Sequence, residues 1–346
     1  MSIDLPSVLQ WLGAEGLERL RLTFGPTAAY GAPALTGAML FSVLYYVQRR
    51  RERGRRASLR GFVRSIFAAR IVLAKSSLVD MRLWTLNALV LASGYGCLAV
   101  GNVFCRDLVV AGLTRALGPH APSAWPSWAV LSMATLFELL AYDLAYWFAH
   151  YLFHRIPALW EFHKVHHSAE VMTPLTELRE HPVEILAFMN LIAIATGAVF
   201  GVMTYAFGPG VRPFTLLNGN IALMGFLITY GHLRHSHMWI PFTGLVGKLL
   251  QSPAHHQIHH STHPKHFDKN LGFALAMWDW LFGTLYVPSK EPEALHFGVA
   301  PDEGDFSSVA RSFATPFVRI GERVAKAAHP LAPGPKTAPE VQRSPG

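Results

Sequence analysis

The stretch DLAYWFAHYLFH, residues Asp143–His154, closes a long apolar run with two histidines four positions apart. Residues i and i+4 share one face of an α-helix, so His150 and His154 can reach one metal ion from a single helix. Asp143 and Trp147 lie on the same stripe. Asp143 can accept the second N–H of a ligand imidazole, or it can make a hydrogen bond between helices. The stretch predicts a helix that enters a membrane and binds metal.

Further histidines cluster downstream of this helix, among 18 in the chain of 346 residues. Two copies of HxxHH follow, and each can turn two or three imidazoles the same way. Neutral imidazole is the commonest protein ligand for transition metals, and sites made only of imidazoles suit Zn, Cu, Fe or Ni. One metal does not need so many ligands, so the set predicts two metals. The candidate ligands are His150, His154, His163, His166, His167, His256, His259 and His260.

Composition favours a membrane protein over a soluble helical domain. Hydrophobic residues make up 51% and charged residues 15%, against about 25% charged residues in a soluble domain. The chain is expected to be an all-α integral membrane helical bundle, with a cytoplasmic helical cap that carries a histidine-rich dimetal site. Five stretches are apolar enough to enter or cross a bilayer. They lie near Ala32–Val47, Leu83–Phe104, Trp128–Phe148, Val183–Phe207 and Phe214–Tyr230.

Basic residues predict the orientation. Arginines are dense from Arg49 to Arg82, whereas only Arg106 and Arg115 lie between the second and third stretches. Basic loops stay on the cytoplasmic side, so alternating crossings bring every histidine cluster to that side. The net charge of +8 fits this juxtamembrane run, and no nucleic-acid-binding motif accompanies it.

Four segments are expected. Residues 1–31 form an amphipathic N-terminal segment without the pattern of a cleavable signal peptide. Residues 32–130 hold N-terminal transmembrane helices and the basic cytoplasmic segment. Residues 131–290 form the catalytic domain, and residues 291–346 a C-terminal segment whose Pro/Gly/Ala-rich tail is expected to be flexible. Cys97 and Cys105 are too few for a disulfide framework or a cysteine-based zinc site.

The motifs DLAYWFAHYLFH, LWEFHKVHHS, HLRHSH, SPAHHQIHHSTHPKHFDKNLG and WDWLFGTLYVP, in this order between Leu140 and Val287, resemble the fatty acid hydroxylase/sterol desaturase superfamily. The resemblance implies a non-haem di-iron centre that activates O2 and attacks a C–H bond of a lipid. It also implies an external electron donor, and the eight histidines above as ligands. His235 matches an additional family histidine. His232 is a further candidate ligand, and the role of His237 stays open.

Several other residues match the family pattern. Asp268, Asn270 and Asp279 are expected to hydrogen-bond ligand imidazoles or cap helices, and Gly272 and Gly283 to allow turns. Further candidates are His181 at the site mouth, His255, His263 and His266 as supporting or solvated residues, and Trp278, Trp280 and Phe282 as interfacial anchors. His120, His296 and His329 are expected to have no metal role.

The expected activity is hydroxylation or desaturation of a fatty acyl, sterol or ether lipid, with two irons that zinc can replace in purified protein. Hydroxylation or ether cleavage is favoured, because no acyl-CoA or acyl-carrier handle is visible. The competing interpretation is a histidine-rich membrane metal carrier or sensor. Transporters place polar ligands near mid-membrane, whereas these clusters lie at the ends of apolar segments. A degenerate family member with a structural role is disfavoured, because all three motifs are intact.

Overall fold

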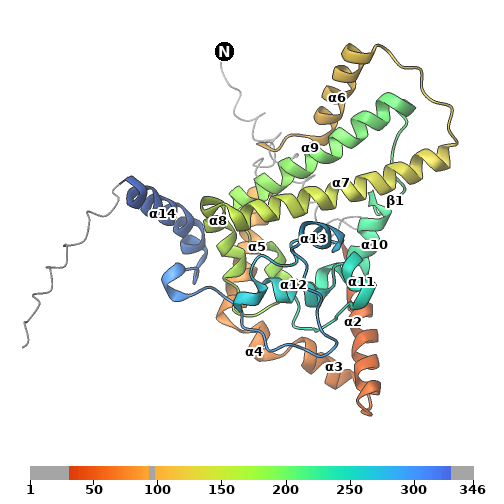
Figure 1. Cartoon of the computed structure of the whole chain (residues 1–346). Coiled ribbons are helices and arrows are strands. Elements are labelled where there is room, and N and C mark those ends of the chain that lie inside the picture. The colour runs from red at the N-terminus through yellow and green to blue at the C-terminus, as the bar shows by residue number, and fades with distance from the viewer. Residues whose placement is uncertain (1–30, 93–97, 329–346) are drawn as a thin grey trace, which may run out of the picture.

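The computed structural model describes residues 31–92 and 98–328, and this part of the chain is mostly helical (Figure 1). The N-terminal segment before Gly31 and the tail after Ala328 lie outside the described residues, as does Cys97. The α-helices are α2 Ala32–Glu52, α3 Leu59–Ile66, α4 Ala69–Val72, α5 Lys75–Ala92, α6 Asn102–Leu117, α7 Ser127–Arg155, α8 Pro157–His167, α9 Pro182–Phe207, α10 Ile221–Thr229, α11 Gly244–Leu249, α12 Pro253–His259, α13 Met277–Phe282 and α14 Val309–Ala328. The 3-10 helices are η2 Pro174–Leu178, η3 Gly231–Leu233, η4 Pro264–His266 and η5 Pro301–Glu303, and the strands are β1 Thr215–Leu216 and β2 Gly219–Asn220.

Helices α7 and α9 are the two within the described residues that are long and apolar enough to cross a bilayer. They lie side by side (Figure 1) and correspond to the third and fourth predicted stretches. The proline at position 157 holds Ile156 in an extended conformation, which ends α7 and begins α8 at a sharp corner. The ends of α7 and α9 nearest α8 therefore border the same cap of shorter helices.

Two of the other three predicted stretches do not form a single long helix. The fifth, Phe214–Tyr230, was expected to cross, but it holds the hairpin of β1 and β2 and then α10 of nine residues. Leu217 and Asn218 adopt positive φ in the hairpin turn, and Asn220 caps α10. A nine-residue helix spans about 14 Å, less than half of a hydrocarbon core.

The second stretch, Leu83–Phe104, is also divided: α5 ends at Ala92 and α6 begins at Asn102. The first lies on α2, which is long enough to cross but less apolar than α7 and α9. The expectation of a single spanning helix was therefore wrong for the second and fifth stretches, whereas the first does lie on one continuous helix. Two candidate spans and a large cap describe the fold better.

Glycines allow α6 to lie close against α9. An added Cβ at Gly197 would lie 2.5 Å from both the Asn102 carbonyl oxygen and the Cys105 Cβ. Cys105 is thus a small apolar filler between these helices, and a larger residue at position 197 would separate them.

A buried arginine ties the cap together. The Arg179 guanidinium donates to Asp80 on α5 at 2.6 Å and to the Val165 carbonyl on α8 at 2.8 Å. It also donates to Ser168 and to the Phe306 carbonyl near the C-terminal helix. Because a buried charge needs such partners, this cluster fixes α8 relative to α5 and the C-terminal segment.

Candidate metal centre

Nine histidines form two adjoining groups, and within each group the candidate ligand atoms lie within 4.8 Å of one another. The first group comprises His150, His154, His163, His167 and His259, and the second comprises His166, His235, His256 and His260. Eight of the nine rings are buried, and His154 is nearly so. The structure brings together all eight histidines of the three motifs and His235. His232 lies outside both groups and faces Glu177, with 3.5 Å between its Nδ1 and Oε2.

Each HxxHH motif contributes to both groups. On α8, His163 and His167 belong to the first group and His166 to the second. On α12 and the residue after it, the arrangement is reversed: the i and i+4 residues, His256 and His260, join the second group, and His259 joins the first. Positions i+3 and i+4 lie about 100° apart around a helix. The two helices therefore face each other with interleaved ligands.

Hydrogen bonds fix the tautomers of four of the five rings in the first group. The Nδ1 atoms of His150 and His259 donate to the carbonyl oxygens of Leu271 and Lys269, each at 2.8 Å. His163 Nδ1 donates to Glu184 Oε1 at 2.5 Å, and His154 Nδ1 lies 3.3 Å from Asp268 Oδ1. Because a carbonyl or an ionised carboxylate can only accept, the Nε2 of each of these four rings carries a lone pair.

The Nε2 lone pairs of His150 and His163 point at each other, and the His167 ring joins them. His163 Nε2 lies 3.0 Å from His150 Nε2 and 3.1 Å from His167 Nε2. The Nε2 atoms of His154 and His259 are buried without a hydrogen-bond partner in the described part of the chain. Lone pairs in such contact repel, whereas two nitrogens that share one ion, each about 2.1 Å from it, lie roughly 3 Å apart. The residues present therefore fit a bound cation.

In the second group the Nε2 atoms also point toward one another, but the Nδ1 atoms have different surroundings. His235 Nε2 lies 2.7 Å from His256 Nε2 and 3.1 Å from His166 Nε2. The Nδ1 atoms of His235, His256 and His260 are buried, and none makes a hydrogen bond within the described residues. Packing of neighbouring rings, rather than an acceptor behind each ring, holds this group.

Burial keeps these rings neutral. It lowers the pKa of His259 to about 4 and that of His166 to about 3, and the nearby His259 ring adds to the effect on the pKa of His166. The pKa values of His163, His167 and His260 also fall well below the usual range, first through burial and then through nearby histidines. Neutral imidazole is the form that binds metal, so the site is ready for a metal at neutral pH.

Residues 135–284, which include both groups, match the fatty acid hydroxylase family. This matched segment, which is less than half of the chain, belongs to the fatty acid hydroxylase/sterol desaturase superfamily. It is 26% identical to an alkylglycerol monooxygenase of Danio rerio over 53% of this chain and 35% of that protein. It is 25% identical to an ornithine lipid hydroxylase of Rhizobium tropici over 65% of this chain and 62% of that protein. Against human cholesterol 25-hydroxylase the identity is 28%, over 54% and 62% of the two chains.

The matched part of the chain spans about a third of the alkylglycerol monooxygenase and under two thirds of the other two relatives. No solved structure matches the chain significantly.

Three of the four acidic or amide residues predicted to support the histidine groups act indirectly. Asp143 accepts from the backbone N–H groups of Ala274 and Leu275, so it joins α7 to a loop and contacts no imidazole. Asp279 accepts from the N–H groups of Leu271 and Gly272, next to the carbonyl that receives the His150 proton. Asn270 binds backbone atoms of His255 and Tyr286. Asp268 alone among the four lies beside a ligand ring, that of His154.

The carboxylate of Glu184 was missed in the sequence. It lies at the start of α9 in the segment EHPVE and receives the shortest of the imidazole hydrogen bonds described above. An acidic residue in the first turn of an apolar helix was a usable signal, because such a residue needs a partner when buried. The carbonyls of Leu271 and Lys269 had no such signal, since every residue carries a carbonyl.

The remaining histidines have local roles. His181 caps α9 by accepting from the Val183 N–H and approaches the Phe313 carbonyl, so it joins α9 to α14. His255 takes part in the cap of α12, His263 caps η4, and His266 lies near Glu293. His237 donates to the Ser65 carbonyl at 2.7 Å.

Proposed function

We propose that the chain is a membrane-bound di-iron oxygenase that hydroxylates or desaturates a lipid, with O2 and an external electron donor. The observation that carries this proposal is the pair of buried imidazole groups whose Nε2 atoms converge at about 3 Å. The named relatives support the substrate class, because they act on an alkylglycerol, an ornithine lipid and cholesterol. In the hydroxylation, one oxygen atom of O2 is inserted into the C–H bond, and the other leaves as water after taking up two electrons from the donor and two protons from the solvent.

Two bound irons would supply the O2 activation that an unreactive C–H bond needs. The role of the protein would be to hold nine neutral imidazole rings with their Nε2 atoms pointing inward and to fix the tautomers of four of them. Burial excludes water from these rings, which protects a reactive centre from side reactions. Acceptors behind His150, His163 and His259 raise the basicity of these ligands and hold their orientation.

We also propose that the metal centre faces the cytoplasm and that the chain crosses the membrane more than once. The basic segment is attached to the cap that carries the imidazoles: His237 donates to Ser65 in this segment, and Asp80 pairs with Arg179. Its arginines favour the inner side of the membrane. Reporter fusions after Arg56 and after Arg155 should both give cytoplasmic signals, and opposite signals would refute this orientation.

The direct test of the oxygenase is metal content. Protein expressed under iron-replete conditions and purified anaerobically should hold about two irons per chain, as measured by elemental analysis. Protein that holds neither iron nor substituting zinc would refute the dimetal site.

A second experiment separates oxidation from metal transport. Membrane lipids from cells with and without the gene are compared by mass spectrometry. A gain of one oxygen identifies hydroxylation, and a loss of two hydrogens identifies desaturation. Unchanged lipids together with altered metal uptake would refute the oxygenase and favour a metal carrier.

A further inference from the structure

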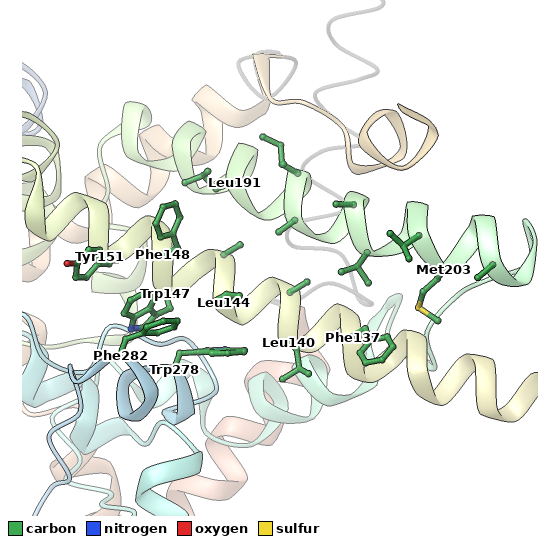
Figure 2. Close-up of a pocket in the computed structure, with 18 of the residues that line it drawn as sticks. Phe137, Leu140, Leu144, Trp147, Phe148, Tyr151, Leu191, Met203, Trp278 and Phe282 are labelled. Carbon is green, nitrogen blue, oxygen red and sulfur yellow. The ribbon is translucent and has the colours of Figure 1, made fainter. Parts of the chain in front are cut away.

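A cavity of about 400 Å³ opens onto both imidazole groups, and we call it the mouth. Four candidate ligand rings are part of its lining: His154, His167, His259 and His260. A larger cavity, of about 1170 Å³, lies between α7 and α9 with α13 at one end (Figure 2), but none of the nine histidines lines it. The mouth is therefore a route by which a small molecule outside the protein can reach the metal centre.

One wall of the mouth is a short segment from the C-terminal part of the chain. Four residues of this segment line the cavity: Gly298, Val299, Ala300 and Glu303. We call residues 298–304 the strap. Before the strap, the His296 carbonyl accepts from the Thr262 N–H at 2.9 Å, and after it the Phe306 carbonyl accepts from Arg179 at 3.3 Å. The chain is thus held on both sides of a segment that borders the ligand rings.

The strap itself has few contacts with the rest of the protein. No backbone–backbone hydrogen bond among the described residues joins it to another segment, and the one from the Glu303 N–H to the Ala300 carbonyl is internal. Val299 is partly buried against a hydrophobic cluster of the cap, and the Glu303 carboxylate lies 3.4 Å from the Lys164 ammonium. Segments with few buried contacts and unbonded backbone open at low free energy. The strap can therefore move while the cap stays folded.

The ion pair of the strap is built to separate without leaving a buried charge alone. The Glu303 side chain is 40% exposed, whereas that of Lys164 is 2% exposed. Lys164 also pairs at 2.9 Å with Glu161, which is fully buried. When Glu303 moves away, Lys164 keeps this second partner and Glu303 gains water. Opening therefore avoids the large cost of an unpaired charge in the interior.

Glycines occupy both ends of the strap. Gly298 has a φ of +101° and Gly304 a φ of +138°, which residues with a Cβ rarely adopt. Rotation at a few such terminal positions is how lids move in many enzymes. An added Cβ at Gly298 would meet Glu170 no closer than 3.6 Å, whereas one at Gly304 would lie 2.7 Å from Thr315 Cγ2. Gly298 thus has room to rotate, and Gly304 is the more tightly packed end.

We propose that the strap opens and closes the mouth, and that the ion pair between Glu303 and Lys164 is the latch that holds it closed. Closure separates the ligand rings from solvent, and opening admits molecules that react at the metals or exchange them. The proposal rests on the dimetal site of the proposed function and adds a control of access to that site.

The latch is tested by the rate of metal release, which needs no turnover. Full-length protein loaded with zinc in detergent is mixed with excess pyridylazoresorcinol, and the absorbance of the zinc complex is followed. Glu303→Gln should speed release about twofold to fivefold, the effect of a partly exposed ion pair. High salt should speed release from the parent protein and have less effect on this variant. An unchanged release rate in Glu303→Gln would overturn the latch.

Glu322→Gln is the matched control. The Glu322 carboxylate is 49% exposed and pairs with Arg319 on α14, and neither residue lines the mouth. This variant should release zinc like the parent protein. Faster release from Glu303→Gln at an unchanged melting temperature separates opening of the strap from general destabilisation. Equal acceleration in the two variants would show that surface charge, rather than the latch, controls release.

The strap is tested separately by tying it shut. Ala300 and Phe267 are exposed and line the mouth, so cysteines at both positions can be joined by a short bismaleimide after Cys97 and Cys105 are replaced by alanine. Zinc release should be several-fold slower than from the same protein with both thiols capped by N-ethylmaleimide. Equal rates would overturn the strap. Protein that binds no zinc at all would instead refute the dimetal site, so the two failures are distinguishable.

Discussion

The two imidazole groups share α8 and α12 but differ in what lies behind their rings. Four of the five rings in the first group have Nδ1 beside a carbonyl or carboxylate. In the second group, three of the four rings have a buried Nδ1 with no acceptor in the described residues. An acceptor fixes the tautomer and raises ligand basicity, and its loss typically costs tenfold to a hundredfold in metal affinity. The first group should therefore hold its metal more tightly than the second.

The largest effect is expected from removing one ring of each group. His163→Ala deletes a central ligand of the first group and leaves Glu184 buried without its imidazole, so this site should lose its metal. His256→Ala should empty the second site and leave the first filled. Lipid oxidation should fall to background in both variants. Elemental analysis should find about one metal per chain for His256→Ala and at most one for His163→Ala.

The difference in metal content between these two variants tests which group binds metal more tightly. If His256→Ala empties both sites while His163→Ala keeps one metal, the second group is the tighter site and the comparison is reversed. Melting temperature of the metal-free variants provides the control for misfolding.

Acidification should destabilise the metal-free protein. Unfolded histidine has a pKa near 6.5, whereas burial lowers the pKa of His259 to about 4 and of His166 to about 3. Between these values the unfolded chain binds more protons, so the free energy of unfolding falls as the pH drops from about 6.5 towards 4. Above pH 6.5 these rings add no pH dependence.

Thermal melts of the metal-free protein at several pH values measure how the free energy of unfolding depends on pH. His166→Gln removes one titrating ring and should make this dependence weaker. A melting temperature that stays constant from neutral pH to about pH 4.5 would contradict the burial of neutral rings. Metal should reduce this dependence until protons displace it.

The sequence was sufficient for features that depend on regular spacing. The i, i+4 relation placed His150 and His154 on one helix face, and the long apolar runs of α7 and α9 identified two candidate membrane helices. The split of each HxxHH between two groups was not predicted. It depends on how α8 and α12 face each other across the centre, which a local pattern does not contain.

The wrong prediction of a membrane-spanning helix in one apolar stretch has a different explanation. Hydropathy alone made Phe214–Tyr230 a candidate span, yet the turn at Leu217 and Asn218 divides it into a hairpin and a short helix. Asn-Gly at positions 218–219 was a turn signal that outweighs apolar composition. Asp143 was equally ambiguous in the sequence, because a buried carboxylate can serve a backbone N–H as well as an imidazole.

A smaller effect than ligand removal is expected from Glu184→Gln. The substitution keeps the shape of the side chain but replaces a carboxylate acceptor at 2.5 Å from His163 Nδ1 with a neutral amide. Metal affinity of the first site should fall about tenfold to a hundredfold, and the second site should change little. Competition with chelators of increasing affinity measures the metal affinity of each site.

Glu138→Gln is the matched control for this variant. Glu138 is a partly buried carboxylate on α7 that accepts from Asn220 and contacts no imidazole. It should leave both affinities unchanged. Equal losses in the two variants would mean that charge in the helical pair, rather than support of His163, determines affinity.

The smallest effect is expected from Asp268→Asn. Asp268 has positive φ, a conformation that asparagine also tolerates, so the loop should keep its shape. Its contact with His154 Nδ1 is longer, at 3.3 Å, the carboxylate is 33% exposed, and Arg155 shares it. Partial exposure screens the interaction, so affinity of the first site should fall by about tenfold or less, and less at high salt. Arg155→Gln, which removes the competing cation, should shift the affinity in the opposite direction. A loss for Asp268→Asn as large as that for Glu184→Gln would show that burial of the supporting carboxylate does not set the strength of the first site.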